Sequence, residues 1–314
     1  MQRTSTTASD PMPVYNRGVL PQAETIELLL QQSKRRGDAV PIRRAFVQDT
    51  EDGVALVQKP GPLSRLVRHE KALDLLLLFY AVTSGGDFGA VERAETWGRA
   101  TGLTFATDGS AGSSVSRLWN RLAGLGLVTR STKGRLAKVT KLLEDGSGGP
   151  YTVPNGGAAR KEVYFRLPYA YWRDGLHKRL DMSGKIALLI GMSLRKPTFP
   201  LPQTATFAGY YGISEATLRR GINNLVDAKV LTKVDAEVYE TTETVTGYGR
   251  RTLYSFSPPY DLNVDNKTKE AMTKAAEEAS AGLGPLTEFA QPLPPGRLRA
   301  EAESAPQLEG GEEK

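Results

Sequence analysis

The chain has 314 residues, a formal net charge of +6 and no cysteine, so disulfides, thiolate metal sites and cysteine nucleophiles are excluded. With only two histidines, His69 and His177, a histidine-rich metal site is not expected. The longest apolar run, residues 75–82, is far shorter than the roughly 20 residues of a bilayer span. The start of the chain has no apolar leader, so we expect a cytoplasmic protein.

The charge is unevenly distributed along the chain. Residues 261–314 contain 11 acidic and 6 basic residues, a net of −5, so residues 1–260 carry +11. A basic body is typical of a protein that binds a polyanion, although a solubility surplus without function is an equally open interpretation.

The N-terminal part divides into a polar stretch and two short elements. Residues 1–20 are polar with several prolines, and we expect them to be disordered. Within residues 21–62, the pattern predicts a helix over 23–36, whose last three residues are basic and suit the negative end of the helix dipole. A hairpin with an Asp-Gly turn is predicted over 43–58.

Two similar units follow, a first over residues 63–167 and a second over residues 168–260. Each contains a hydrophobic leading helix, predicted over 69–83 and 183–194, then a second helix, a glycine turn, an amphipathic third helix and two strand-like segments. Residues 261–314 are expected to be mostly disordered, apart from a short helix over 267–280.

The third helix of the second unit has the clearest pattern. Gly212 can adopt positive φ and end the preceding helix, and Ser214 is placed to cap the next one. The helix then has an apolar stripe, which consists of Leu218, Ile222, Leu225 and Val226. The opposite side carries Ala216, Arg220, Asn223 and Asp227, with Arg219 and Asn224 beside it.

This pattern resembles the bacterial helix-turn-helix, in which a small residue, glycine, an aliphatic residue and a helix cap follow one another at fixed spacing. The matching positions are Ala208, Gly212, Ile213 and Ser214, followed by Thr217, Leu218, Arg220 and Leu225. An ordinary helical hairpin with a glycine corner is the alternative. A strand over 199–202 and a hairpin after the third helix make the unit similar to a winged helix, with Arg250 and Arg251 in the wing.

The first unit resembles a degenerate copy of the second. A shift of 103 residues places Arg220 and Asn223 on Arg117 and Asn120, an outward pair that could read guanine and adenine. A polar insert, 104–112, separates its glycine turn from the third helix, and its second helix is predicted over 91–101. Its wing strands are predicted over 136–143 and 162–167, joined by a glycine-rich tip. This region is strongly basic through Arg130, Lys133, Arg135, Lys138, Lys141, Arg160 and Lys161.

Signs of an active site are lacking: the sequence has no phosphate-binding glycine loop and no metal-spaced cluster, and both histidines are expected at the surface or at helix ends. We therefore expect no catalytic residue, no metal and no cofactor.

The predicted fold class is mainly α with β-hairpin wings (α+β): two winged-helix domains in tandem with flexible termini. The resemblance implies a sequence-specific protein that binds double-stranded DNA, either a plasmid-type replication initiator or a transcriptional regulator. Self-association into a homodimer stays open, and so does a non-enzymatic scaffold that docks proteins. The predicted DNA-binding residues are Ser214, Ala216, Thr217, Arg219, Arg220, Asn223, Arg250, Arg251, Arg117, Asn120, Arg121, Lys133 and Arg135.

Overall fold

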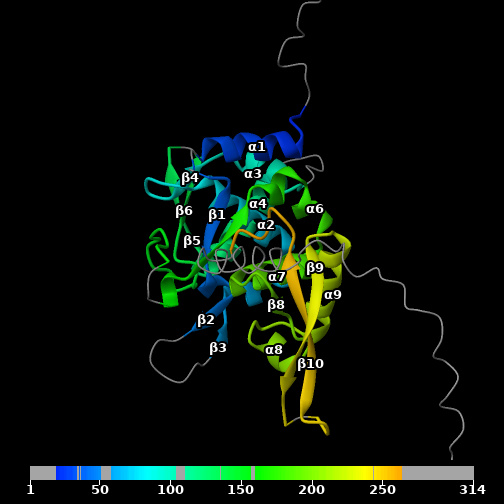
Figure 1. Cartoon of the computed structure of the whole chain (residues 1–314). Coiled ribbons are helices and arrows are strands. Elements are labelled where there is room, and N and C mark those ends of the chain that lie inside the picture. Colours follow the sequence, from blue (N-terminus) through cyan, green and yellow to red (C-terminus); the bar gives the residue numbers. More distant parts are fainter. Residues whose placement is uncertain are drawn as a thin grey trace, which may run out of the picture. The chain divides into compact units, whose positions relative to one another are not determined.

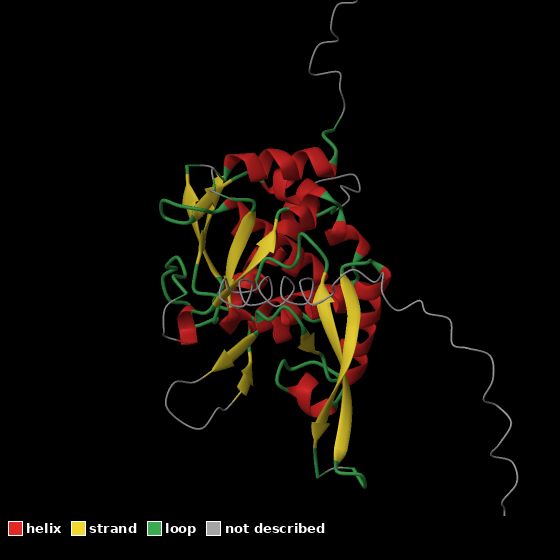
Figure 2. Cartoon of the chain, viewed as in Figure 1, coloured by secondary structure: helices red, strands yellow, loops and turns green. Residues whose placement is uncertain are grey.

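The computed structural model describes residues 19–33, 35, 37–50, 58–103, 110–134, 136–156, 160–242 and 244–263. All of them belong to one compact unit, residues 1–265. The described residues form helices and small antiparallel sheets, so the fold class is α+β (Figures 1 and 2). The predicted helix over 267–280, the turn at 52–53 and nearly all of the predicted disordered ends lie outside the described residues.

The N-terminal elements contain the predicted helix, over shorter bounds, and a displaced form of the predicted hairpin, since residues 45–46, expected to begin its first strand, form a 3-10 turn and its strands pair over 48–50 and 58–60. They are α1 (Gln22–Gln32), β1 (Ala39–Arg43), the 3-10 turn η2 (Arg44–Phe46), β2 (Gln48–Thr50) and β3 (Gln58–Pro60). β2 and β3 pair antiparallel, Gln48 opposite Pro60. Arg35 was expected to close its own helix; its guanidinium instead donates to the carbonyls of Tyr80 and Thr83, 3.1 Å from each. These two carbonyls lie at the end of a different helix, α2 (Glu70–Val82).

The next elements contain the predicted first unit. They are η3 (Pro62–Leu66), α2 (Glu70–Val82), β4 (Gly89–Val91), α3 (Ala94–Ala100), α4 (Ser110–Gly124), β5 (Val128–Lys133) and β6 (Leu136–Lys141). The three strands form a sheet in the order β4-β6-β5. The second helix was predicted to begin at residue 91, but residues 89–91 are β4, which pairs with β6.

The second unit repeats this order of elements. After η4 (Arg160–Glu162) and β7 (Tyr164–Pro168) come α5 (Ala170–Arg173), α6 (Leu176–Arg179), α7 (Met182–Leu194), β8 (Phe199–Pro200), α8 (Ala205–Gly209), α9 (Glu215–Asp227), β9 (Leu231–Glu240) and β10 (Tyr248–Phe256). Its sheet has the order β8-β10-β9, so in both units the first strand pairs with the third and the third with the second. From α2 and from α7 onward, the described chain runs twice through helix, strand, two helices and two strands.

The glycine turns after α3 and α8 have the same geometry. Gly102 and Gly212 have φ of +66° and +63°, which favour glycine. The next residue in each turn donates its N–H back into the preceding helix, Leu103 to the Gly98 carbonyl and Ile213 to the Ala208 carbonyl. The polar insert of the first unit therefore follows an intact turn; residues 104–109 lie outside the described residues, and the rest of the insert, 110–112, begins α4.

The predicted wing of the first unit is wrong in its pairing. β6 pairs with β5, Val128 opposite Lys141, whereas β7 pairs antiparallel with the N-terminal strand β1, Ala39 opposite Pro168. The pairing with β1 removes four apolar side chains from water: Val40, Ile42, Phe165 and Leu167 are fully buried. The burial of these side chains stabilises the pairing of β7 with β1 more than the hairpin indicated by the glycine-rich segment would be stabilised.

The two units meet at their leading helices. Lys185 of α7 is 1 % exposed, and its ammonium lies 2.7 Å from Glu70 Oε1 and 2.6 Å from Asp74 Oδ1, both on α2. Buried apolar residues of the N-terminal segment and of both units form one continuous core. The fold therefore joins the two repeats through packing and a buried ion cluster.

Candidate nucleic-acid interface

α9 is held in place by its cap and by its packing on α7. The Ser214 Oγ accepts a hydrogen bond from the Thr217 N–H at 3.1 Å, as predicted for a helix cap. The stripe residues Leu218, Ile222 and Leu225 are buried, and Val226 is partly buried. The backbones of α9 and α7 approach each other closely at Gly221, where a Cβ would lie 2.2 Å from the Ser183 carbonyl oxygen of α7.

The opposite side of α9 is uncovered. Ala216, Arg219, Arg220 and Asn223 are exposed. Arg219 lies 3.9 Å from Glu215 one turn earlier, a contact between two exposed groups that restrains it little. Asn224 differs, since its Oδ1 accepts a hydrogen bond from the Asp181 N–H at the start of α7. Two cationic side chains and one amide therefore face outward from a rigidly seated helix.

Thr217 is a correction to the predicted set. Its side chain is buried, and its hydroxyl lies 2.8 Å from that of Ser214. Both residues stabilise the start of α9, and of the two only Ser214 is exposed. The prediction missed this because the i+3 position after a cap faces back toward the preceding turn.

Arg250 and Arg251 do not act as a pair. Successive residues of a strand point to opposite faces of the sheet. Arg251 donates from Nε to Glu237 Oε2 at 2.7 Å, and its guanidinium carbon lies 5.1 Å from the centre of the Tyr239 ring. Arg250 is exposed, and within the described part of the chain its side chain has no ion pair. Only Arg250 is available from the predicted pair.

The matching residues of the first unit are partly engaged. Asn120 on α4 accepts a hydrogen bond from the Arg130 guanidinium of β5, and Arg117 donates to the Ser114 hydroxyl. Arg121 and Lys133 are exposed, and Arg135 lies outside the described residues. In the second unit the 103-residue shift places Lys233, another described residue, at the position of Arg130, and no bond joins it to Asn223.

Lys141, which the sequence placed on a basic surface, is fully buried. Its ammonium lies 4.1 Å from the centre of the Tyr80 ring, 3.8 Å from that of Tyr151, and 3.5 Å from Glu144 Oε1. Burial lowers the pKa of Lys141 to about 8. Lys138 of the same predicted basic group forms an ion pair with Asp87. The basic surface of the first unit is therefore smaller than its sequence indicates.

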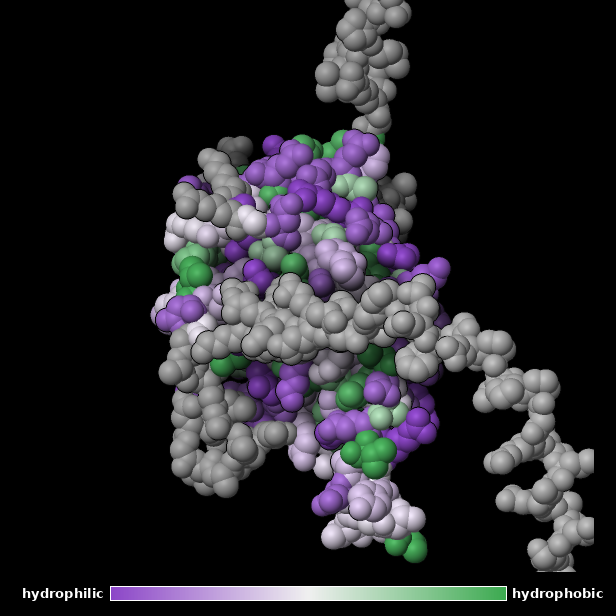
Figure 3. All heavy atoms as spheres, in the orientation of Figure 1, coloured by the Kyte–Doolittle hydropathy of each residue, from purple (hydrophilic) through white to green (hydrophobic). Residues whose placement is uncertain are grey.

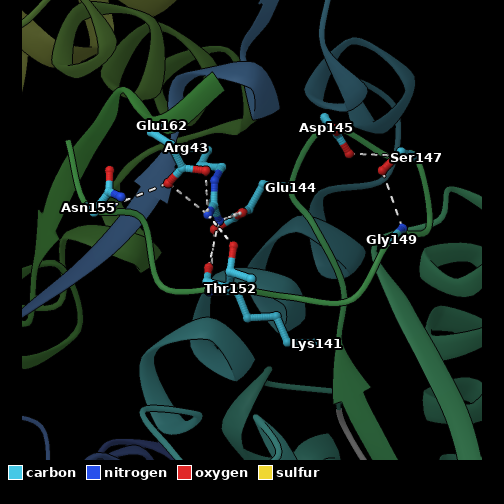
Figure 4. Close-up of polar contacts among 9 residues, drawn as sticks. All are labelled: Arg43, Lys141, Glu144, Asp145, Ser147, Gly149, Thr152, Asn155 and Glu162. Carbon is cyan, nitrogen blue, oxygen red and sulfur yellow. Dashed lines mark hydrogen bonds and ion pairs between the residues drawn. The ribbon is translucent and has the colours of Figure 1, made fainter. Parts of the chain in front are cut away.

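The buried cluster around Lys141 fixes the segment that follows β6 (Figure 4). Arg43 of β1 donates to Glu144 Oε2 at 2.8 Å and to the Thr152 carbonyl and hydroxyl, each at 2.8 Å. It also lies 3.1 Å from Glu162. The residues come from positions about a hundred apart in the chain, and no spacing in the sequence indicates the cluster.

His177 lies in the four-residue helix α6, which fits the expected helix-end position, and its side chain is buried at the junction of the two units. Its Nδ1 lies 3.2 Å from the Tyr171 carbonyl oxygen, and burial lowers its pKa to about 4, so the ring is neutral at pH 7. It lines a cavity of about 200 Å³ together with Lys71, Asp74, Trp172 and Lys185. His69 lies where expected, at the residue before α2.

Among the described residues, no cluster of three acidic or histidine side chains could hold a metal ion. No helix in the same part of the chain has the length and apolar character that crossing a bilayer requires.

Comparisons of the sequence with protein-family models and with curated proteins, and of the structure with solved structures, gave no match.

Proposed function

We propose that the two repeats are tandem winged-helix units and that the chain binds double-stranded DNA with sequence preference. The support for the architecture is the order helix, strand, helix, helix, strand, strand, which occurs twice with the same strand order in the sheet. A hairpin follows the third helix in each repeat and would form the wing.

The single observation that carries DNA recognition is the uncovered polar side of α9. Arg219, Arg220 and Asn223 stand exposed on a helix whose other side is seated on α7. In a major groove, Asn223 would pair with adenine, and Arg220 with guanine or a nearby phosphate. The net charge of +11 over residues 1–260 would supply the affinity that does not depend on sequence.

The two units would contribute differently. Asn120 is already bonded to Arg130, and a polar insert precedes α4. Base reading by the first unit would first require that bond to open. Its exposed cations Arg117, Arg121 and Lys133 would instead contact phosphates.

For the cellular process we propose two roles, a plasmid-type replication initiator or a transcriptional regulator. Two such units in one chain favour the initiator, whereas the pattern around α9 resembles that of many regulators. Repeated copies of the recovered DNA site beside the gene would indicate the first, and a palindrome over a promoter the second.

The test is selection of bound duplexes from a random pool with the wild type and with Asn223→Ala. We expect the wild type to recover a defined motif, and the variant to lose preference at one or two positions by about 1–3 kcal/mol per position. Nonspecific affinity should stay close to that of the wild type.

The matched control is Asn120→Ala, the corresponding change in the first unit, which should leave the selected motif unchanged. A wild-type protein that recovers no motif, or an Asn223→Ala variant that recovers the same one, would contradict base reading by α9. A DNA affinity that does not fall as the salt concentration rises would contradict a phosphate-based interface altogether.

A further inference from the structure

The cavity of about 200 Å³ at the junction of the two repeats is built from three parts of the chain. Its lining comes from α1, from α2 and the glycine turn after α3 in the first repeat, and from α5, α6 and α7 of the second. Around α1 and α6 the surface of the molecule is largely hydrophilic (Figure 3). A molecule held in this cavity would contact both repeats at once.

The cavity is rich in positive charge. Three lysines line it, each from a different helix: Lys71 from α2, Lys178 from α6 and Lys185 from α7. Burial, and in addition the positive charges of these lysines, lowers the pKa of His177 to about 4. The imidazole ring in the lining is therefore neutral at pH 7, and the positive potential there comes from the lysines.

The three lysines differ in their partners. Lys185 is 1 % exposed, and its ammonium contacts both acids of the lining, Glu70 at 2.7 Å and Asp74 at 2.6 Å. Lys71 donates to a backbone carbonyl oxygen at 2.9 Å, and Lys178 is exposed. Among the described residues, neither Lys71 nor Lys178 forms an ion pair. Two cations of the cavity are therefore without a carboxylate of their own.

The two acids keep hydrogen-bonding capacity that a ligand can use. A carboxylate can accept about four hydrogen bonds, and Lys185 uses one oxygen of each, Glu70 Oε1 and Asp74 Oδ1. The side chain of Glu70 is 43 % exposed and that of Asp74 12 % exposed, so hydroxyl groups can reach the remaining oxygens. The apolar part of the lining consists of Leu78, Ala100 and Trp172.

The volume of the cavity admits only a small molecule. A cavity of about 150 Å³ holds benzene, so a cavity of about 200 Å³ has room for roughly 6–10 non-hydrogen atoms. A nucleotide or a peptide is too large to lie inside it. The ligand that fits is therefore small and has an anionic group, hydroxyl groups and a short carbon skeleton.

We propose that the cavity binds a small organic oxyanion that carries hydroxyl groups, either a phosphate monoester or a hydroxy acid. Its anionic group contacts Lys71 and Lys178, and its hydroxyl groups donate to Glu70 and Asp74. Because these residues belong to both repeats, the ligand holds the two repeats in one arrangement. The site lies apart from the exposed side of α9, and the proposal does not depend on DNA binding.

The experiment is isothermal titration calorimetry of the full chain in the absence of DNA. The three probes share a three-carbon skeleton: glycerol 3-phosphate supplies a phosphate, glycerate supplies a carboxylate, and glycerol has no charge. The variants are Lys71→Gln and Lys178→Gln. Arg179→Gln is the matched control, since it removes the same charge from the same helix as Lys178→Gln at an exposed residue that does not line the cavity.

We expect one molecule of glycerol 3-phosphate or of glycerate to bind per chain, and glycerol not to bind. Lys71→Gln and Lys178→Gln should each weaken binding by about tenfold, because a hydrogen bond to a charged group is lost. Arg179→Gln should stay within about twofold of the wild type, because solvent screens its charge. The indole N–H signal of Trp172, one of three tryptophans in the chain, should shift during an NMR titration.

The two anions identify the source of the charge: tighter binding of glycerol 3-phosphate supports a phosphate monoester, and tighter binding of glycerate supports a hydroxy acid. Because the replaced side chains are exposed, the melting temperatures of the variants should stay close to that of the wild type.

Three results would overturn the proposal. The first is the absence of saturable binding by both anions, and the second is binding of glycerol as tight as theirs. The third is an equal loss of affinity in Arg179→Gln, which would indicate a diffuse attraction to a basic surface. A chain that selects no DNA motif and still binds the anion through Lys71 and Lys178 would support this site and defeat only the proposed function.

Discussion

At the scale of single residues, Lys141 shows how burial changes what a basic side chain does. Its ammonium is enclosed by Tyr80, Tyr151 and Glu144, and its pKa falls to about 8 because the charged form loses its water. Glu144 is buried as well and holds Arg43 through its other oxygen. The cluster ties the segment after β6 to β1. Lys141, which the sequence pattern placed on a basic surface, therefore has a structural role.

The lowered pKa predicts a pH-dependent stability. A folded-state pKa of about 8, below the ordinary 10.5, means that the contribution of Lys141 is fully present above pH 10.5 and is lost as the pH falls toward 8. Relative to Lys141→Met, the wild type should therefore gain unfolding free energy between pH 8 and 10.5. Urea denaturation of both proteins across this range measures the difference, which also cancels the titration of the tyrosines. Parallel curves would contradict a lowered pKa of Lys141 in the folded state.

At the scale of elements, α9 shows how one helix is both seated and displayed. The cap at Ser214 fixes its start, the stripe fixes its rotation, and Gly221 allows its backbone to touch α7. The side left outward is then a consequence of the side that is buried. α4 is likewise buried on one side and exposed on the other, except that its Asn120 already accepts a hydrogen bond from Arg130.

Gly221→Ala should lift α9 from α7. The new Cβ would lie 2.2 Å from a backbone oxygen and 2.7 Å from the Ala187 Cβ, neither of which can move aside alone. We expect a net loss of about 1–3 kcal/mol of unfolding free energy, since overpacking outweighs the gain in helix propensity. Gly124→Ala, at the end of α4 with open space around it, is the control and should be neutral or slightly stabilising. Equal stability of both variants would argue against the close contact.

At the scale of the whole molecule, the buried ammonium of Lys185 joins the two repeats. Burial raises the pKa of Asp74 even though Lys185 lies beside it, so the ion cluster is held at a desolvation cost. We expect such a cluster to fix the register of α7 on α2 more than it adds stability. The relative placement of α4 and α9 depends on that register.

Lys185→Met should destabilise the junction. Removing the cation leaves Asp74 buried without a partner, and we expect a loss of about 3 kcal/mol, the lower end for a broken buried pair, because Glu70 is 43 % exposed. Hydrogen exchange should rise in α2 and α7 before it rises in β9 and β10. Adding Asp74→Leu to the same chain should restore most of the stability. No recovery in the double variant would show that the loss comes from packing and not from the orphaned carboxylate.

Several features of the fold follow from short stretches of the sequence. The cap at Ser214, the stripe of α9, the short strand β8 and the leading helices are all encoded within about 15 consecutive residues. Periodicity, capping and turn chemistry act over that range, so these predictions are confirmed within a few residues. The exposure of Arg219, Arg220 and Asn223 followed from the same periodicity.

The sequence by itself determined most of the local elements and which side of α9 faces outward, because these depend on neighbours along the chain. Only the tertiary structure decided that β7 pairs with β1, that Lys141, His177 and Lys185 are buried, and that Arg251 is held by Glu237 while Arg250 stays exposed. These outcomes depend largely on partners that folding brings together from distant positions. Strand pairing and the desolvation of charge are settled by the whole core, which no short stretch of sequence contains.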